Sequence, residues 1–176
     1  MVETTVDDVQ HARGTRTTDT TRTRWRTFAW IAIVVSDAGF LLWGATAALL
    51  PQYLLGPGGK PILPAGYEGF THGSWTELVA WSPPTAAFMT MLFRLFGTLC
   101  AVFGFLAVLI AAKPFRRGER WAWWALLVGN TLAYGAPMTY DRLVHAIGPF
   151  EMTEYVGIAL VYLALAVTAP FLRRAD

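Results

Sequence analysis

The chain has one cysteine, three histidines and few charged residues, and each scarcity excludes a class of protein. Charged residues make up only 15% of the 176 residues. Because Cys100 is alone, the chain can form neither an internal disulfide nor a cysteine-based metal cluster. His11 and His72 lie outside the long apolar runs, and His145 lies at the outer edge of the third, which argues against histidine ligation of a haem within those runs. We therefore predict no cofactor and no metal site.

Catalytic sequence motifs are missing as well. The sequence contains no HExxH, GxSxG, Walker A or CxxC motif, and no GxGxxG between a strand and a helix. The sequence therefore identifies no catalytic residue. A net charge of +2 gives no basis for nucleic-acid binding. The two halves of the chain show no inverted repeat with broken helices, which disfavours a conventional transporter.

Four long apolar runs make up most of the remaining sequence. A hydrocarbon core of ~30 Å requires about 20 helical residues. We predict an all-α fold, an integral membrane four-helix bundle with spans at 28–50, 85–112, 121–147 and 151–172. The first run could instead be a signal peptide. It is longer than the apolar region of such peptides and contains an acid, Asp37, so we expect it to be retained.

The segments outside these runs are polar or rich in Gly and Pro. Residues 1–27 contain nine Thr and five Arg, and we expect them to form a disordered cytoplasmic tail, with a second short tail at 173–176. The first half of 51–84 is expected to be an ordered outward loop. Its second half contains Ser74-Trp75-Thr76-Glu77, a capping box that predicts a short interfacial helix over 74–81.

The distribution of Lys and Arg predicts the orientation of the bundle. The N-terminal tail, the turn after the second span and the C-terminal tail carry eleven of these residues, whereas the loops at 51–84 and 141–150 carry two. Cytoplasmic loops are the ones enriched in Lys and Arg. We therefore expect a multi-pass protein of the plasma membrane with both termini in the cytoplasm.

Several polar residues occur inside the predicted spans. Counting along the helices places Asp37 and Asn130 in one layer near the middle of the membrane, with Arg94 and Tyr134 on its outer side. Ionisable residues at such depths usually face protein or a water-filled cavity. We predict a polar pocket open to the outside, with Asp37, Arg94, Asn130 and Tyr134 inside it and Glu154, Asp141 and His145 at its mouth.

A purely structural interpretation of the same residues stays open. Polar side chains in membrane bundles often only join helices, with modest energies of ~0.6–2 kcal/mol each. Arg94 could extend its side chain to the membrane interface. Glu154 lies in the first turn of the fourth span, where a carboxylate is favoured by the helix dipole.

Three stretches carry a resemblance to a known family: SWTELVAWSPP at 74–84, FRLFG around Arg94, and RRGERWAWW at 116–124. Over residues 28–172 the chain resembles small bacterial four-helix integral membrane proteins, the DoxX-like proteins. The resemblance implies a four-helix plasma-membrane protein and carries over no catalytic residue. Some DoxX-like proteins are linked to quinone or thiol-redox chemistry, for which this chain offers the lone Cys100.

The sequence therefore predicts a non-enzymatic membrane protein, either an accessory subunit of a membrane complex or a binder of a lipid-like ligand. Its expected partners are membrane lipids, another membrane protein or a second copy of itself, and not nucleic acid. One alternative is a membrane enzyme acting on a lipid or isoprenoid, with Asp37 as acid/base and Arg94 holding an anionic group. Another is a proton-coupled carrier in which Asp37 titrates during transport.

Overall fold

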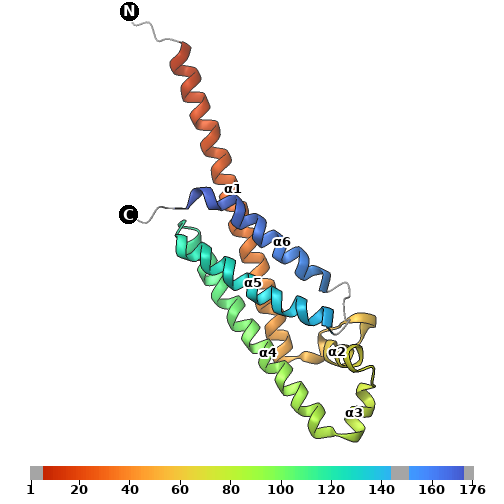
Figure 1. Cartoon of the computed structure of the whole chain (residues 1–176). Helices are drawn as coiled ribbons and strands as arrows, with labels where there is room; N and C mark the ends of the chain where they lie inside the picture. Colours follow the sequence, from red (N-terminus) through yellow and green to blue (C-terminus); the bar gives the residue numbers. More distant parts are fainter. Residues whose placement is uncertain (1–5, 144–150, 173–176) are drawn as a thin grey trace, which may run out of the picture.

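The computed structural model describes residues 6–143 and 151–172, and the chain is all-helical there (Figure 1). Within these ranges the only strand-like pairing is an isolated bridge between Leu55 and Pro61. The elements are α1 (Val6–Leu49), η1 (Pro51–Tyr53), η2 (Pro57–Gly59), α2 (Ile62–Thr71), α3 (Trp75–Trp81), α4 (Pro83–Ile110), η3 (Ala111–Phe115), α5 (Arg120–Leu143), α6 (Glu151–Thr168) and η4 (Ala169–Phe171).

The four long helices form a ring in which each packs against two neighbours. α1 contacts α4 and α6, and α5 contacts the same two helices, so that α1 and α5 lie on a diagonal. The interface between α1 and α4 is the most extensive. α2 and α3 cover one end of the bundle, which we call the lid end, and η3 lies at the opposite turn end (Figure 1).

Small residues bring α1 and α4 into close contact. Gly97, Cys100, Gly104 and Ala107 are buried on one stripe of α4. A Cβ atom placed on Gly97 would lie 2.6 Å from the Cβ of Ala47. Close backbone approach of this kind is how helices gain packing energy where lipid removes the hydrophobic drive.

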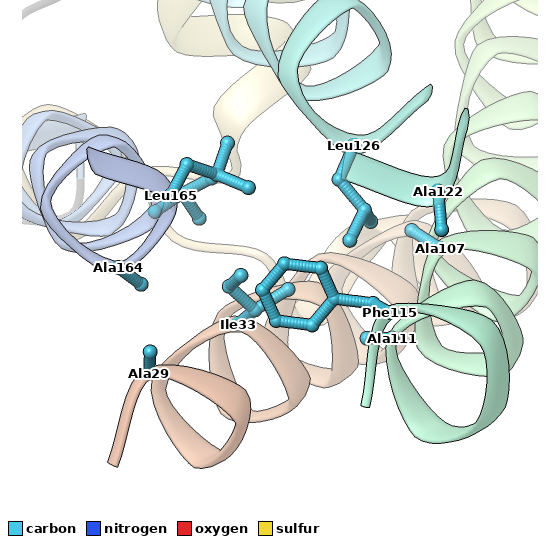
Figure 2. Packing of buried hydrophobic residues seen from close by; sticks show 10 residues of the cluster. Ala29, Ile33, Ala107, Ala111, Phe115, Ala122, Leu126, Ala164 and Leu165 are labelled. Carbon is cyan, nitrogen blue, oxygen red and sulfur yellow. The ribbon is translucent and has the colours of Figure 1, made fainter. Parts of the chain in front are cut away.

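The hydrophobic core lies toward the turn end. Figure 2 shows the ring of Phe115 between the side chains of Ile33 and Leu126, with Leu165 reaching in from α6. Four alanines fill the narrow spaces between these large side chains. These alanines are almost completely buried: Ala29, Ala107, Ala111 and Ala122. The core thus joins α1, α4, η3, α5 and α6 at one level.

The outside of the bundle is apolar, whereas its inside contains polar groups. Among the buried residues are Asp37, Asn130 and Asp141. All four long helices expose large hydrophobic side chains, such as Leu42, Leu99, Phe105, Leu132 and Leu163. Two helical stretches, Arg24–Leu49 and Pro83–Phe115, are long and apolar enough to cross a membrane. An exposed apolar surface of this extent is unusual for a protein surrounded by water.

The segment 1–27, which the sequence predicted to be a disordered tail, lies largely within α1. α1 begins at Val6, so most of 1–27 continues the first span as helix and projects beyond the bundle (Figure 1). The first 27 residues contain no proline, and extending an existing helix avoids the cost of nucleation.

The predicted loop at the start of 51–84 was also wrong in part, because it contains helix α2. Pro64 stands in the first turn of this helix, where its missing N–H group is not needed. The helix ends at Thr71, and the following His72 adopts a left-handed conformation with a φ of 57°. The predicted short helix at 74–81 is confirmed as α3, and the Ser74 hydroxyl accepts a hydrogen bond from the Glu77 backbone. The predicted end of the third span at Ile147, with His145, lies outside the described residues.

Candidate ligand-binding site

Among the charged residues that the structure describes, Asp37 is the most completely buried. It lies on the same face of α1 as Ile33 and Phe40, and its side chain is completely buried. Neither of its carboxylate oxygens has a hydrogen-bond partner of standard geometry. Since burying a carboxyl group without donors is costly, its immediate neighbours decide what it can do.

Asn130 of α5 is one of these neighbours. Its side chain is also completely buried and lies beside the Asp37 carboxyl group. The Asn130 amide donates to the Leu126 carbonyl oxygen at 3.0 Å, whereas its own Oδ1 atom receives no donor. In this contact, the Asp37 carboxylate oxygens and the Asn130 Oδ1 atom are therefore all acceptors that receive no hydrogen bond.

Tyr134 extends this cluster by one turn toward the lid end. Its hydroxyl donates to the Ser36 carbonyl oxygen at 3.4 Å, which joins α5 to α1 across the bundle. Its ring lies 5.3 Å from that of Phe40 and faces the backbone of Gly157 in α6. The structure thus brings together Asp37, Asn130 and Tyr134, three of the residues that the sequence placed in the polar pocket.

Arg94 does not join this cluster. Its side chain is exposed, and no acidic group pairs with it in the described part of the chain. The reason lies in the length of α1, which ends at Leu49, one residue past the Ala47–Ala48 pair that packs against Gly97. Arg94 lies one helical turn beyond Gly97, at a level where α1 has already ended, so α1 does not cover its side chain. The expectation that it lies inside the pocket is corrected accordingly.

A cavity of about 320 Å³ opens between the helices at the lid end, and we call it the lid pocket. Apolar side chains dominate its wall, while Asp141 and Glu154 supply carboxyl groups. Pockets that hold small molecules have this pattern of an apolar wall with a few polar groups. Its lining residues are Trp43, Ile62, Leu63, Met89, Leu92, Phe93, Phe96, Ala136, Pro137, Tyr140, Asp141 and Glu154.

A second hollow of about 450 Å³ lies between α1 and α6. Trp43 and Glu154 line both cavities, so they form the partition between them. Tyr134 lines this second hollow as well. The Asp37–Asn130–Tyr134 cluster is therefore connected to this second hollow through Tyr134, whereas Asp37 itself lines neither cavity.

The segment that covers the lid pocket is held by one ion pair. Lys60 contacts the Glu68 carboxylate at 2.5 Å, and the other carboxylate oxygen accepts a hydrogen bond from the Trp75 backbone at 3.2 Å. Lys60 and this hydrogen bond hold the pKa of Glu68 below its usual value. Because Glu68 lies in α2 and Trp75 begins α3, these contacts fix the two short helices relative to each other.

Sequence reasoning found the polar residues but missed the apolar half of the site. Ile62 and Leu63 were assigned to a loop, although they line the pocket from α2. Trp43 was treated only as part of an apolar span. No residue pattern distinguishes a tryptophan facing a cavity from one facing lipid, so the sequence held no signal for it.

The chemistry available at the site favours binding. The carboxyl groups can accept hydrogen bonds or pair with a cation, and the apolar wall can hold a hydrocarbon. No group of three or more His, Cys, Asp or Glu side chains is placed to hold a metal ion within the ranges that the structure covers. Comparisons with protein-family models, with curated proteins and with solved structures found no match for this chain.

Proposed function

We propose that the chain is a four-span plasma-membrane protein whose lid pocket binds an amphiphilic, lipid-like molecule. The observation that carries this proposal is the composition of the pocket, an apolar wall with Asp141 and Glu154 as its acidic residues. Such a cavity suits a molecule with a hydrocarbon body and a polar head that donates hydrogen bonds or carries positive charge. The volume of about 320 Å³ falls within the range of small-molecule sites.

The apolar exterior of the bundle supports the membrane part of the proposal. With α1 and α4 as spans, their neighbours α5 and α6 complete a ring whose outer surface is also apolar. The charge distribution then places both termini in the cytoplasm and the lid end outside. The resemblance to DoxX-like proteins belongs to the same proposal and rests on the sequence alone.

The exposed position of Arg94 counts against the alternative of a membrane enzyme. That alternative needs Asp37 and Arg94 at one reaction centre, yet Arg94 is exposed beyond the end of α1 and Asp37 lines neither cavity. A role as an accessory subunit is compatible with ligand binding. The pocket itself is what an experiment can address directly.

The direct test is to fill the pocket and measure bound lipid. Ala136→Phe places a ring in the lid pocket, while Ala87→Phe adds the same ring at an exposed position of α4 that does not line it. We expect native mass spectrometry of protein extracted from membranes to show a retained amphiphile with the wild type and Ala87→Phe, and not with Ala136→Phe. Equal retention by all three proteins would rule out the pocket as the site.

The topology is tested separately with reporter fusions. A reporter inserted at Gly58, near the lid end, and one at Gly118, in the turn after η3, should report opposite sides of the membrane. Finding both reporters on one side would contradict the four-span arrangement.

A further inference from the structure

A third cavity lies at the turn end, far from the lid pocket. Its volume is about 250 Å³, and we call it the turn pocket. It is formed where the start of the apolar part of α1 meets η3, the following turn and the end of α6. Its lining residues are Arg26, Thr27, Trp30, Phe115, Arg116, Gly118, Thr168 and Leu172.

Two arginines from distant parts of the chain converge on this pocket. The Arg26 guanidinium donates a hydrogen bond to the Arg116 carbonyl oxygen at 3.2 Å. The Arg116 guanidinium lies over the Trp30 ring, 4.9 Å from its centroid. These contacts hold the two arginine side chains in place, although the residues are 90 positions apart in the sequence. They do so even though the two like charges repel each other.

The polar groups of the pocket favour an anion. None of the described residues that line it is acidic. The Trp30 indole nitrogen is buried and has no acceptor for its hydrogen. An unpartnered buried donor costs about 1–3 kcal/mol, which an acceptor oxygen entering the pocket would recover. Two guanidinium groups and an indole N–H match the oxygens of a phosphate group.

The level of the pocket in the bundle indicates what could carry the phosphate. It lies just beyond the hydrophobic core, of which Phe115 is a member, and so at the edge of the apolar belt. In the proposed orientation this edge is the cytoplasmic headgroup layer. Basic pockets between helices on that side commonly hold anionic lipid headgroups.

We propose that the turn pocket binds a phosphate group, supplied by an anionic phospholipid headgroup or by a free phosphate. Arg26 and Arg116 pair with the phosphate oxygens, and Trp30 donates its indole hydrogen. The simpler explanation, that these arginines only set the orientation of the spans, requires neither a cavity nor their convergence. It also predicts that every basic residue of the region matters equally.

Matched variants separate the two explanations. Arg26→Gln with Arg116→Gln removes the two charges that line the pocket. Arg24→Gln with Arg117→Gln removes two exposed charges from the same helix and the same turn, and neither lines it. Each protein is purified in detergent and titrated with phosphatidylglycerol or with phosphatidylcholine, and native mass spectrometry counts the bound lipids.

We expect the wild type to prefer phosphatidylglycerol, and the pocket pair to lose about fivefold in affinity for each arginine. The Arg24→Gln, Arg117→Gln double variant should keep most of the preference. Trp30→Phe, which retains the ring under Arg116 but lacks the donor, should lose about fivefold. Equal losses in the two double variants, or no preference in the wild type, would overturn the proposal.

A competition experiment identifies the source of the phosphate. If inorganic phosphate at millimolar concentration displaces phosphatidylglycerol from the wild type, the pocket accepts a free phosphate. If only the lipid binds, the headgroup is the ligand and its chains contribute to affinity. Ala136→Phe should leave this binding unchanged, so a failure of the lid-pocket proposal would not affect the result.

Discussion

Gly104 of α4 lies directly against the backbone of Leu41 in α1. A Cβ atom at position 104 would stand 2.6 Å from the Leu41 nitrogen, a distance that real side chains do not adopt. The neighbouring atoms belong to the backbone of another helix and cannot rotate away. The close contact between α1 and α4, the most extensive helix interface of the bundle, therefore requires glycine at position 104.

We expect Gly104→Ala to destabilise the protein by about 1–3 kcal/mol, because the added methyl group must push α1 and α4 apart. Gly39→Ala is the matched control, since a Cβ there would meet nothing within 4 Å. Alanine favours helix over glycine, so Gly39→Ala should be neutral or stabilise by up to ~1 kcal/mol. Thermal unfolding in detergent micelles measures both. Similar unfolding temperatures for the two variants would contradict the close packing.

Sequence periodicity predicted the helix faces well, because each long helix has a stripe of small or polar residues that lipid would not favour. Asp37 of α1 was expected inside the bundle, and it is buried together with Ile33 and Phe40 on the same helix face. The same reasoning placed Asn130 and Tyr134 on the inner face of α5. Helical spacing alone carries this information, since it does not depend on where a helix ends.

Features that depend on the ends of helices could not be predicted in this way. Arg94 shares a stripe with Gly97, yet it is exposed because α1 ends beside Gly97. The helix α2 was hidden by Pro64 and Gly66, which usually mark loops. Gly66 packs against the Tyr140 hydroxyl, a tertiary contact that no local pattern reveals.

Asp37→Asn should stabilise the protein. The amide that replaces the carboxyl group supplies hydrogen atoms, and the adjacent Asn130 Oδ1 atom has no donor in the wild type. One net hydrogen bond contributes about 1 kcal/mol, and a costly buried carboxyl group disappears as well. The measurement is thermal unfolding in detergent, together with the lipids bound in native mass spectrometry and growth of the host.

The opposite change provides the control for Asp37. Asn130→Asp adds a second carboxyl group beside the first, and we expect a loss of stability. If Asp37→Asn instead lowers stability by more than ~1 kcal/mol, the native carboxyl group itself stabilises the packing of the helices. Intact stability with loss of a bound ligand or of growth would show that its role is functional.

The contact between α2 and α3 should weaken in acid. The pKa of Glu68 is lowered in the folded protein by Lys60 and by the Trp75 N–H group. Its contribution to stability is therefore complete above the ordinary pKa of a glutamate, and is lost as the pH falls through the lower folded value. Hydrogen exchange at the Trp75 amide, measured between pH 6 and roughly pH 3 and corrected for intrinsic rates, reports this loss.

Two variants define the origin of this pH dependence. Glu68→Gln should give fast exchange at Trp75 throughout, because the paired carboxylate is absent. Glu77→Gln changes an exposed glutamate of α3 whose side chain does not contact Lys60 or the Trp75 amide, and it should keep the wild-type profile. A pH dependence that survives in Glu68→Gln would assign the effect to another group.

Tyr134 and Gly157 should be energetically coupled. A Cβ atom on Gly157 would lie 3.1 Å from the Tyr134 hydroxyl and 3.2 Å from its ring. The ring is held on its other side by Phe40, and the hydroxyl by the Ser36 carbonyl oxygen, so it has little room to retreat. Gly157→Ala should therefore cost more in the wild type than in a Tyr134→Phe background, where the nearest atom is gone.

A double-mutant cycle measures this coupling. The higher helix propensity of alanine contributes equally in the wild-type and the Tyr134→Phe backgrounds and therefore cancels. We expect a coupling of about 0.5–1 kcal/mol from unfolding temperatures of the four proteins. Gly129→Ala, whose added atom meets Phe103 rather than Tyr134, should show no coupling to Tyr134→Phe. If the losses of stability from Gly157→Ala and Tyr134→Phe simply add, the two residues are not coupled. α6 would then move aside to accommodate the added methyl group, and the contact between Gly157 and Tyr134 would not limit the width of the hollow between α1 and α6.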